Sequence, residues 1–422
     1  MQVENFVSFT KKTANVLGIS CYYNLLPLVL LSVREIKRQH PELTVVLGGP
    51  GPSVVSQKIL EKFPSVDIIA KGEGERTVVE VLQALTRDNK PLSDVKGISY
   101  RRKNKIYLNP PRERIKDLDE IPFPAYHRIK ASNYHEFGII TSRGCPFNCT
   151  FCQVSPLWGR YNTRRSIDNI LEEIALLYNK YGVRRVIIFD DLFTLYRKRV
   201  LDFYKKLKEE CLDIEWFCLN RVDVVDEELI KKIAESGCTG IQYGVESGSN
   251  KILDLIRKGF TRETAEDTIR KSLKYMKTVV TDFIWGFPFE TMDDFYETVF
   301  FMSQLSKMGV LVEYNMLTPC TLSELYNTYR KSIRFDERLC RDHVWKRHPE
   351  WDRQHIVKLI KQHPDVFSDF YYYYSDTLFQ KYNLLQRAGW LFVKLGSLID
   401  TTESMVPNAK VNKCHSKFQG RN

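Results

Sequence analysis

Three cysteines within eight positions, Cys145, Cys149 and Cys152, are the residues of this sequence with the clearest chemical meaning. They follow one another at intervals of four and three, in a loop that also holds glycine, proline and asparagine. Such a loop can wrap three thiolates around one corner of an iron–sulfur cube, and the fourth iron then stays open for a substrate or cofactor. The cysteines therefore predict a 4Fe–4S cluster with one open iron.

Two other interpretations of the cysteines are weaker. A structural zinc site usually has a fourth cysteine or a histidine nearby. The nearest histidines, His127 and His135, both lie upstream and lack typical zinc spacing. Buried thiols without a ligand are the second alternative, which three cysteines in one short loop of this composition disfavour.

The cysteine loop follows directly on a predicted strand that opens a regular alternation of strands and helices. The six strands are expected at residues 138–142, 185–189, 214–219, 239–244, 280–285 and 311–316. Six strand–helix units predict an α/β fold with a partial (β/α)6 parallel barrel over residues 131–330. Active sites of such barrels lie at the carboxyl ends of the strands, where the cysteine loop begins.

Three further regions flank the predicted barrel. Residues 1–95 alternate short apolar runs with helical patterns, which is typical of a doubly wound, Rossmann-like parallel sheet. Residues 96–130 are predicted to be a hairpin followed by a proline-rich linker. Residues 331–422 are predicted to be a helical, aromatic-rich tail.

Length and composition agree with a globular protein of two or three domains. The chain has 422 residues, of which 43% are hydrophobic and 27% charged, so disorder, a collagen-like chain and a disulfide-stapled miniprotein are excluded. The net charge of +11 permits nucleic acid, anionic lipid or a phosphorylated ligand but requires none of them.

The remaining cysteines and the apolar segments bear on location. Seven of the ten cysteines are scattered singly, which indicates free thiols in a reducing compartment. The longest early apolar stretch, Tyr22 to Val33, is interrupted by Asn24 and is too short to span a bilayer. It also lacks the pattern of a signal peptide. We expect a soluble, cytoplasmic protein without a transmembrane segment.

The motifs together resemble the radical S-adenosylmethionine (radical SAM) superfamily, in its subgroup with a cobalamin-binding domain. The cysteine loop reads CPFNCTFC, with an aromatic residue just before the third cysteine. Four later segments stand in the order of the family's strand-end motifs, and they read IFDDLFT (188–194), NRVD (220–223), GVESGS (244–249) and IWGFPFET (284–291). The resemblance covers residues 138 to 330.

The resemblance implies how the cofactors are held. Cys145, Cys149 and Cys152 would bind three irons, and the amino and carboxylate groups of SAM would chelate the fourth. An electron from the cluster would then cleave the sulfonium and release a 5′-deoxyadenosyl radical. The other cofactor-binding residues implied are Phe151, Asp190, Asp191, Arg221, Glu246, Ser247 and Gly286.

These residues would have different parts in that site. Phe151 would pack on the adenine, and Asp190 or Asp191 would accept a hydrogen bond from the methionine ammonium. Glu246, followed by Ser247, would accept from the ribose hydroxyls, and Gly286 would let the backbone approach the adenine.

Each assignment has a plainer alternative. The two aspartates are also typical helix caps, and Glu246 could cap the helix that follows it. Arg221 would meet a carboxylate or form a surface ion pair, and Phe151 could be a core residue.

Two segments depart from the family pattern. Phe289 stands where the fifth-strand turn usually has glycine, which would narrow the pocket or change the turn. After the sixth strand the family tends to have Thr-Pro-aromatic-Pro-Gly-Thr, but this chain has Thr318-Pro319-Cys320-Thr321-Leu322. This difference puts the substrate-side loop in doubt, not the cluster.

Residues 15–85 resemble the second half of the family's cobalamin-binding domain. Ser20 stands in the family's serine position, Gly48 and Gly49 follow, and residues 71–77 read KGEGERT like the closing segment. The family's Asp-x-His-x-x-Gly segment would lie further upstream than this chain extends, so we expect a truncated domain. None of the eight histidines can replace that ligand by position. Because binding without a histidine occurs in the family, cobalamin binding is left open.

Three functional interpretations follow. The first is a 4Fe–4S radical SAM enzyme, for example a cobalamin-dependent methyltransferase, that modifies an unactivated carbon of a small molecule, lipid or peptide. It would need an electron donor such as flavodoxin or ferredoxin. The second is a methylthiotransferase-like tRNA modifier. It is disfavoured, and nucleic acid with it, because the amino-terminal domain has only Cys21 instead of a second cysteine trio. The third is a non-catalytic cobalamin- or cluster-binding remnant.

Overall fold

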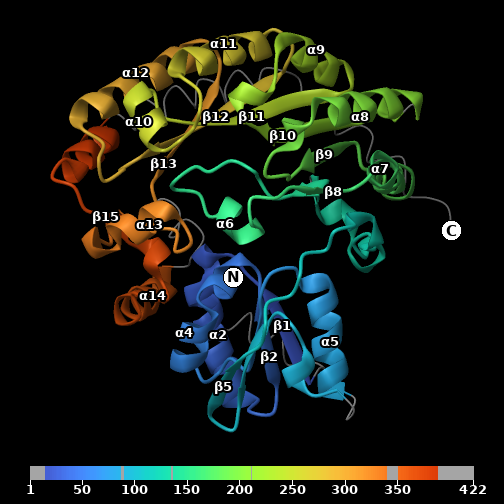
Figure 1. The fold of residues 1–422 in the computed structure, drawn as a ribbon, viewed down its shortest axis with the longest axis vertical. Coiled ribbons are helices and arrows are strands. Elements are labelled where there is room, and N and C mark those ends of the chain that lie inside the picture. The colour runs from blue at the N-terminus through green and yellow to red at the C-terminus, as the bar shows by residue number, and fades with distance from the viewer. Residues whose placement is uncertain (1–14, 87–89, 135, 211, 340–349, 388–422) are drawn as a thin grey trace.

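The computed structural model describes residues 15–86, 90–134, 136–210, 212–339 and 350–387. Figure 1 shows two α/β layers, with the amino-terminal domain below a larger curved sheet and its helices. The carboxy-terminal region runs along one side and contacts both. Within the described residues, no helix is both long and apolar enough to cross a membrane.

The amino-terminal domain is a five-stranded sheet with helices on both faces. Its strands lie in the order β1-β2-β3-β4-β5. Their bounds are β1 Val16–Ser20, β2 Thr44–Gly48, β3 Ile68–Ala70, β4 Ile98–Arg102 and β5 Lys105–Leu108. The first three are parallel, as the strand–helix alternation predicts, and the β4–β5 hairpin continues the sheet antiparallel to β3. The hairpin therefore belongs to this sheet, although the sequence suggested that it starts the linker.

The helices of this domain divide between its two faces. One face is covered by α2 and α4, and the other by α5. Their bounds are α2 Leu26–Gln39, α3 Pro50–Val54, α4 Ser56–Lys62 and α5 Gly74–Thr86. The loop after β2 lies against the loop after β1 at Gly49, which has φ +89°. A Cβ there would stand 2.7 Å from the carbonyl oxygen of Cys21.

The larger sheet is a partial parallel barrel, which confirms the predicted fold class. Its strands lie in the order β13-β12-β11-β10-β9-β6, and every neighbouring pair is parallel. Their bounds are β6 Phe137–Ile139, β9 Arg185–Ile188, β10 Glu215–Asn220, β11 Cys238–Glu246, β12 Thr278–Trp285 and β13 Leu311–Met316.

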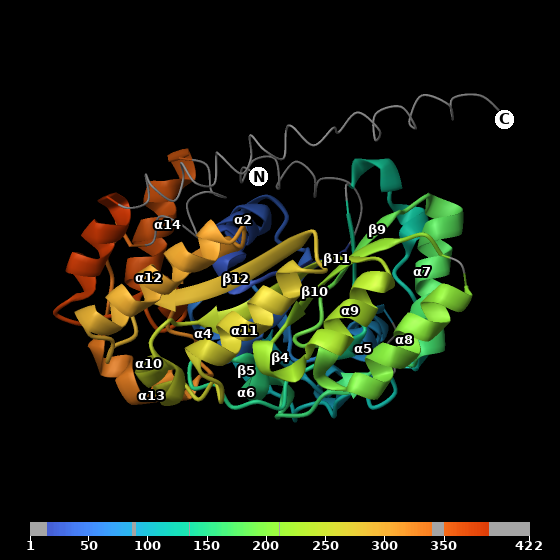
Figure 2. The ribbon, with the colours of Figure 1, turned by 90° about the horizontal axis from the view of Figure 1, so that it is seen from above.

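Helices form an arc over the convex face of this sheet, which Figure 1 shows from the side and Figure 2 from above. Their bounds are α7 Ile167–Tyr181, α8 Arg197–Glu209, α9 Glu227–Glu235, α10 Asn250–Leu255, α11 Arg262–Leu273 and α12 Met292–Lys307. The concave face looks toward the amino-terminal domain. The loop after β6, with α6 (Val154–Trp158) and the β7–β8 hairpin (Ser142–Arg143, Thr163–Arg164), lies between them.

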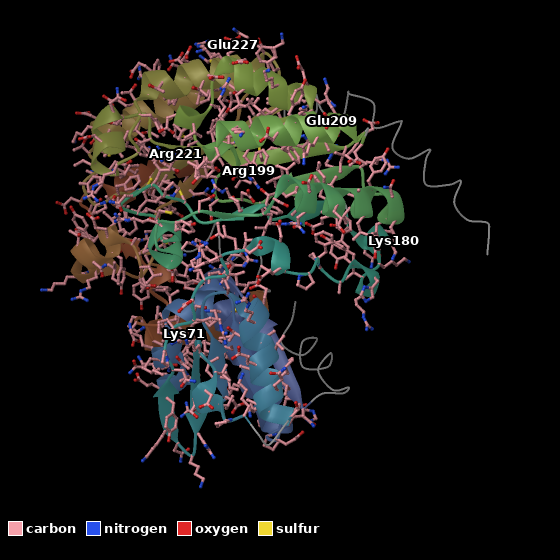
Figure 3. All side chains as sticks on the ribbon, turned by 45° about the vertical axis from the view of Figure 1, so that its right-hand side comes forward. Lys71, Lys180, Arg199, Glu209, Arg221 and Glu227 are labelled. Atoms are coloured by element: carbon pink, nitrogen blue, oxygen red, sulfur yellow. The ribbon has the colours of Figure 1, made fainter. Side chains whose placement is uncertain are left out.

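The carboxyl ends of the three parallel amino-terminal strands, β1 to β3, point toward the barrel. In Figure 3, Lys71, which follows β3, lies at the end of its domain that faces the barrel, whereas Arg221, which follows β10, lies at the level of the large sheet. Loops from both sheets therefore meet in one region, because strands of parallel sheets deliver their loops at their carboxyl ends.

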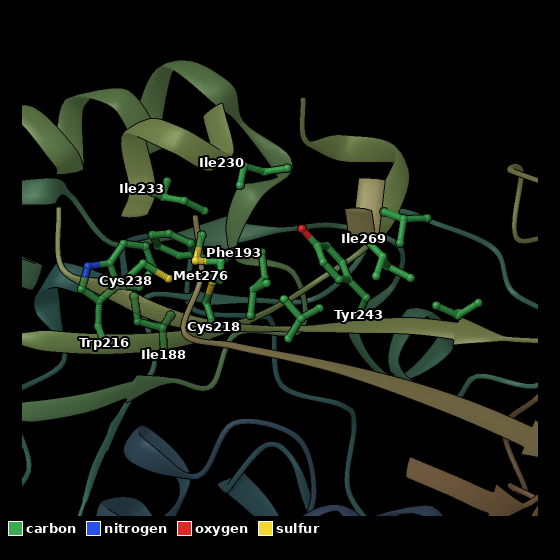
Figure 4. Close-up of a cluster of buried hydrophobic side chains, with 14 of the residues drawn as sticks. Ile188, Phe193, Trp216, Cys218, Ile230, Ile233, Cys238, Tyr243, Ile269 and Met276 are labelled. Atoms are coloured by element: carbon green, nitrogen blue, oxygen red, sulfur yellow. The ribbon is translucent and has the colours of Figure 1, made fainter. Parts of the chain in front are cut away.

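The main core fills the space between the barrel strands and their outer helices. Figure 4 shows strand residues such as Trp216, Cys218 and Tyr243 packed beneath helix residues such as Ile230 and Ile269. All five are at most 1% exposed. The scattered cysteines of the described residues are unpaired thiols, as their isolation predicts.

The carboxy-terminal region packs against both the amino-terminal domain and the barrel. It contains α13 (Glu324–Tyr329), β14 (Ile333–Arg334), α14 (Glu350–Gln362), β15 (Tyr372–Tyr373) and a helical segment at 378–387. The predicted helical tail is thus only partly helical, because Tyr372 and Tyr373 form a strand antiparallel to β14. Residues 388–422 lie outside the described residues.

Helix α14 belongs to the core of the amino-terminal domain. Ile356 and Ile360 are 0% exposed and pack in one cluster with Val33 and Leu47. A helix from the carboxy-terminal region therefore completes the hydrophobic face of α2 and α4. This long-range contact buries apolar area that the small domain alone would leave in water.

Truncating Ile360 tests this contact. Ile360→Ala is expected to lower the free energy of unfolding of the amino-terminal domain by about 2–5 kcal/mol, because it leaves a cavity in a packed core. Ile360→Val, which removes one methylene, is expected to lose only about 0.5–1.5 kcal/mol. Urea unfolding followed by circular dichroism measures both. Equal effects of the two variants would contradict the packing of α14 against this domain.

Candidate functional site

The three clustered cysteines lie half-buried on one loop after β6. The Sγ of Cys149 accepts from Nη1 of Arg221 at 3.6 Å, and the Sγ of Cys152 accepts from the backbone N–H of Val154 at 3.4 Å. Burial raises the pKa of Cys145, and it raises the pKa of Cys152 to about 11; the neighbouring thiols add to both shifts. A positive ion or cluster bound at this loop would oppose the rise of both pKa values.

The donors on this loop are three unpaired thiols. In the described part of the chain, no group of three His, Cys, Asp or Glu side chains lies close enough to hold one ion. A 4Fe–4S cluster has a different requirement, because each thiolate binds a separate iron. Three half-buried thiols on one loop beside a guanidinium meet that requirement.

Asp190, at the end of β9, is committed to the start of the cysteine loop. Its Oδ1 accepts from the backbone N–H groups of Thr141 and Ser142 at 2.6 and 2.9 Å, and its Oδ2 accepts from their hydroxyls at 2.5 and 2.7 Å. The side chain is only 1% exposed. Burial raises the pKa of Asp190, and these four donors oppose the rise. Both oxygens thus accept two hydrogen bonds each within the protein, and contact of Asp190 with the methionine ammonium stays a prediction.

Asp191 holds the next residue of the loop. Its Oδ2 accepts from the backbone N–H of Gly144 at 2.8 Å, while the residue itself is exposed. Gly144 has φ +97°, and a Cβ there would stand 2.1 Å from the carbonyl oxygen of Tyr161, so this position requires glycine. Contact of Asp191 with the methionine ammonium stays a prediction.

Arg221 is buried beside the cysteines, not on the surface. It is 6% exposed, its Nε and Nη2 donate to the carboxylate of Asp223 at 2.9 and 2.8 Å, and its guanidinium lies 3.7 Å from the ring centre of Phe147. Nη2 also donates to the carbonyl of Lys258. This places one fixed positive charge next to the Sγ of Cys149.

Glu246 ends β11 in an unusual backbone conformation. It has φ +74°, and the register with β12 shifts between Gly244 and Glu246. Its Oε1 accepts from Nζ of Lys258 at 3.2 Å, and both side chains are largely buried. Left-handed backbone at a non-glycine residue often marks a functional site. The structure therefore adds Lys258 to the site, a residue that sequence reasoning missed.

Ser247 and Phe151 pack within the protein. The hydroxyl of Ser247, which is 0% exposed, pairs with that of Thr298 at 3.0 Å and accepts from the backbone N–H of Ser249 at 3.1 Å. Phe151 packs edge-on against Phe287 with ring centres 6.1 Å apart. Contacts of Ser247 and Phe151 with a cofactor stay predictions.

Gly286 begins a tight turn after β12. It has φ +87°, and its N–H donates to Oε2 of Glu290 at 2.9 Å. Phe289, which replaces the usual glycine, stacks on Phe287 with ring centres 5.7 Å apart and planes at 19°. The turn therefore accommodates the bulky residue by stacking it on its neighbour.

A carboxylate on the concave face was also missed by sequence reasoning. Asp282 on β12 accepts two hydrogen bonds from the side-chain amide of Gln242 on β11, at 2.9 and 2.8 Å. Burial raises the pKa of Asp282 to about 7, and the nearby carboxylates of Glu246 and Glu313 add to the rise. Alternation along β11 places Gln242, Gly244 and Glu246 on one face of that strand, and the sequence alone could have shown this. It could not have shown that Asp282 on β12 pairs with Gln242, because that contact joins two strands.

The predicted cobalamin-slot residues meet at the carboxyl ends of β1 and β2. Ser20 pairs with Gly48 in the strand register, and the backbone N–H of Cys21 donates to the carbonyl of Gly48 at 3.0 Å. Gly49 lies so close that a Cβ on it would be 2.9 Å from Oγ of Ser20. The small residues thus come together on the edge that faces the barrel, and their contact with cobalamin stays a prediction.

Ion pairs join the closing segment of this domain to the cysteine loop. Arg143, two residues before Cys145, pairs with Glu73 at 2.8 Å and with Glu75 at 2.5 Å. Glu73 is 7% exposed and also accepts from the backbone N–H of Ile115 at 2.6 Å. The KGEGERT segment therefore contacts the cluster loop directly, a role that its likeness to a closing segment did not suggest.

Arg114, a second arginine, lies in the linker and also binds the loop that carries the cysteines. Arg114 donates to the carbonyls of Arg143, Trp158 and Tyr161 at 3.0, 3.0 and 2.8 Å. It lies over the ring of Trp158 at 4.9 Å. One guanidinium thus ties together both ends of the loop that carries the cysteines, because residues 143 and 161 flank it in sequence.

Comparison with known proteins agrees with this geometry. Residues 139–302 match the radical SAM superfamily, and residues 1–82 match the B12 binding domain. The chain belongs to the radical SAM superfamily and carries a B12-binding domain. A radical SAM domain implies a 4Fe–4S cluster and SAM as cofactors, and enzymes with this domain need an electron donor.

Individual relatives share parts of the chain. An uncharacterised methyltransferase of Pyrococcus horikoshii is 34% identical over 290 residues, 68% of this chain and 62% of that protein. An anaerobic magnesium-protoporphyrin IX monomethyl ester cyclase of Cereibacter sphaeroides is 28% identical over 306 residues, 69% of this chain and 49% of that protein. The chain thus matches less than two thirds of the length of either relative.

A solved structure shares the fold of nearly the whole chain. The cobalamin-dependent S-adenosylmethionine radical enzyme OxsB, with aqua-cobalamin bound, superposes with a TM-score of 0.68 and 20% identity. The match covers 97% of this chain and 63% of that one. The combination of the small α/β domain with the partial barrel is therefore a known arrangement.

The bridge between the domains can be broken at Arg143. Arg143→Gln is expected to destabilise the protein by about 3–5 kcal/mol, because it leaves the buried carboxylate of Glu73 without its cation. Trypsin digestion should then cut the linker at 96–130 at least several-fold faster. The control is Arg38→Gln, which removes an arginine exposed on α2. Equal protection of both variants would mean that the ion pairs do not hold the domains together.

The carboxyl group of Asp282 makes a prediction about pH. Its folded-state pKa of about 7 exceeds the unfolded value near 3.9, so the stability it contributes is present at low pH and is lost as pH rises through 7. Asp282→Asn should therefore stabilise the protein more at pH 8 than at pH 5, by about 2 kcal/mol. Urea unfolding at both pH values measures this difference.

The matched control for this prediction is Asp254→Asn, at an exposed position of α10. It should change stability equally at the two pH values. A pH-independent effect of Asp282→Asn would contradict the raised pKa.

Proposed function

We propose that this protein is a 4Fe–4S radical SAM enzyme that modifies an unactivated carbon, as a cobalamin-dependent methyltransferase. The observation that carries the proposal is the placement of Cys145, Cys149 and Cys152. They lie on one loop after β6, and the buried guanidinium of Arg221 contacts the Sγ of Cys149. When bound, the cluster would supply the electron that cleaves SAM reductively.

The residues of the chain would have distinct parts in this function. The three cysteines would hold the cluster, and Arg221 would place its positive charge beside Cys149. Asp191, Glu246 and Gly286 would orient SAM at the carboxyl ends of their strands. Asp190, by contrast, would position the loop through its four internal hydrogen bonds.

The B12-binding domain would bring cobalamin to the same region. Ser20, Gly48 and Gly49 would line the slot for its nucleotide tail, because small side chains leave room there. The ion pairs of Arg143 with Glu73 and Glu75 would keep that slot at a constant distance from the cluster loop. Methyl transfer between two cofactors needs such fixed positions.

The substrate and the partners are proposed only by class. The substrate would be a small molecule, lipid or peptide, and the electron donor would be a flavodoxin or ferredoxin. A cytoplasmic location stays a prediction. The domain boundaries at 95, 130 and 330 are likewise proposals, with the β4–β5 hairpin better assigned to the first domain.

Anaerobic reconstitution with iron and sulfide tests the proposal. The wild-type protein should gain a visible 4Fe–4S absorption band and, with dithionite and SAM, form 5′-deoxyadenosine or S-adenosylhomocysteine. Cys152→Ala should lose the band and both products, because two thiolates do not retain the cluster. Cys238→Ala, which changes a buried thiol of the core, is the matched control and should keep them.

Cobalamin is tested separately by a shift in its visible spectrum on addition to the reconstituted protein. A cluster without any SAM cleavage would overturn the enzymatic function and favour a non-catalytic binding protein. SAM cleavage without cobalamin binding would overturn only the methyltransferase part.

A further inference from the structure

The most deeply buried ion pair of the described structure lies behind the turn that begins at Gly286. Nζ of Lys381, in the helical segment 378–387, lies 3.0 Å from Oε2 of Glu290, and both side chains are 0% exposed. Nζ also donates to the carbonyl oxygen of Glu290 at 2.5 Å. Lys381, from the carboxy-terminal region, thus contacts Glu290 twice, at its side-chain carboxylate and at its backbone carbonyl.

Glu290 is the residue that closes this turn. Its Oε2 accepts from the backbone N–H of Gly286 at 2.9 Å, and its own N–H donates to the carbonyl of Phe287 at 3.1 Å. The next residue, Thr291, caps α12 in a capping box with Asp294. The position of Glu290 therefore fixes both the backbone at Gly286 and the start of the following helix.

The surroundings of the pair are apolar. Trp285, Phe295 and Leu378 form one buried cluster there, and a Cβ on Gly286 would stand 3.3 Å from Cδ1 of Leu378. Burial raises the pKa of Glu290, and the charge of Lys381 and the N–H of Gly286 oppose that rise.

The position of a buried carboxylate such as Glu290 therefore depends on its cation. Without Lys381, Glu290 would have to become protonated or move toward water, and either change would release the N–H of Gly286.

We propose that Lys381 is a positioning residue for SAM binding. Through Glu290 it holds the Gly286 turn in the left-handed conformation that brings backbone to the adenine. The inference rests on the proposed function, which assigns Gly286 to SAM. It extends the SAM site to the carboxy-terminal region, which lies outside the part that matches the superfamily, residues 139–302.

Amide hydrogen exchange tests the positioning without any cofactor. In Lys381→Met, the Gly286 amide should exchange at least tenfold faster than in the wild type, while the Gly144 amide, held by Asp191, should keep its rate. Lys358→Met, at an exposed position of α14, is the matched control and should change neither. Unchanged exchange at Gly286 would overturn the proposal, whether or not the protein binds SAM.

SAM affinity of the reconstituted protein then tests the consequence. Lys381→Met should raise the Kd for SAM, measured by equilibrium dialysis, at least tenfold at unchanged iron content. A lower melting temperature with an unchanged Kd would overturn the positioning role and leave a structural ion pair. A wild-type protein that takes up the cluster but binds no SAM would instead overturn the proposed function.

A double variant guards against simple misfolding. Lys381→Met with Glu290→Gln removes both charges, and the glutamine carbonyl can still accept from Gly286. Because neither charge is then left buried without its partner, the exchange rate and the Kd should return to within about threefold of the wild type. A threefold change corresponds to about 0.6 kcal/mol. Failure of the double variant to recover either value, while it folds, would contradict the role of the ion pair.

Discussion

The burial of Asp190 is the constraint on which the cluster loop depends. A carboxylate that is 1% exposed is strongly destabilised unless donors surround it. Here the donors are the backbone and hydroxyl groups of Thr141 and Ser142. The end of β9 therefore dictates where the chain goes after β6, and the cysteines begin only three residues further on.

Three other carboxylates of the site also accept hydrogen bonds from backbone N–H groups of its loops. Asp191 accepts from the N–H of Gly144, Glu73 from that of Ile115, and Glu290 from that of Gly286. Asp191 and Glu73 bind the main chain of a different segment, whereas Glu290 binds that of its own turn, and Glu73 and Glu290 are each paired with a cation as well. Such groups position loops accurately because a charged acceptor binds backbone N–H groups more strongly than a neutral one does.

Sequence patterns predicted the features that arise locally. Strand–helix alternation predicted the six barrel strands, and the spacing of Cys145, Cys149 and Cys152 predicted a cluster loop at the end of the first. The partners of Asp190, Arg143 and Lys381 could not be predicted, because they lie between about 48 and 91 residues away in the chain. The predicted helical tail differs for a related reason: Tyr372 and Tyr373 form a strand only because β14 is there to pair with them.

These long-range partners place the site at a junction of three regions. From the amino-terminal side, Glu73 and Glu75 hold Arg143 before the first cysteine, and from the carboxy-terminal side, Lys381 holds Glu290 behind Gly286. The barrel supplies the strand ends, yet two of its loops are fixed by charges from outside it. An ion pair in an apolar setting keeps its geometry only while both partners stay in place. The two flanking regions therefore belong to the site as much as the barrel does. Displacing the amino-terminal domain would release the cysteine loop, and displacing the carboxy-terminal region would release the turn at Gly286.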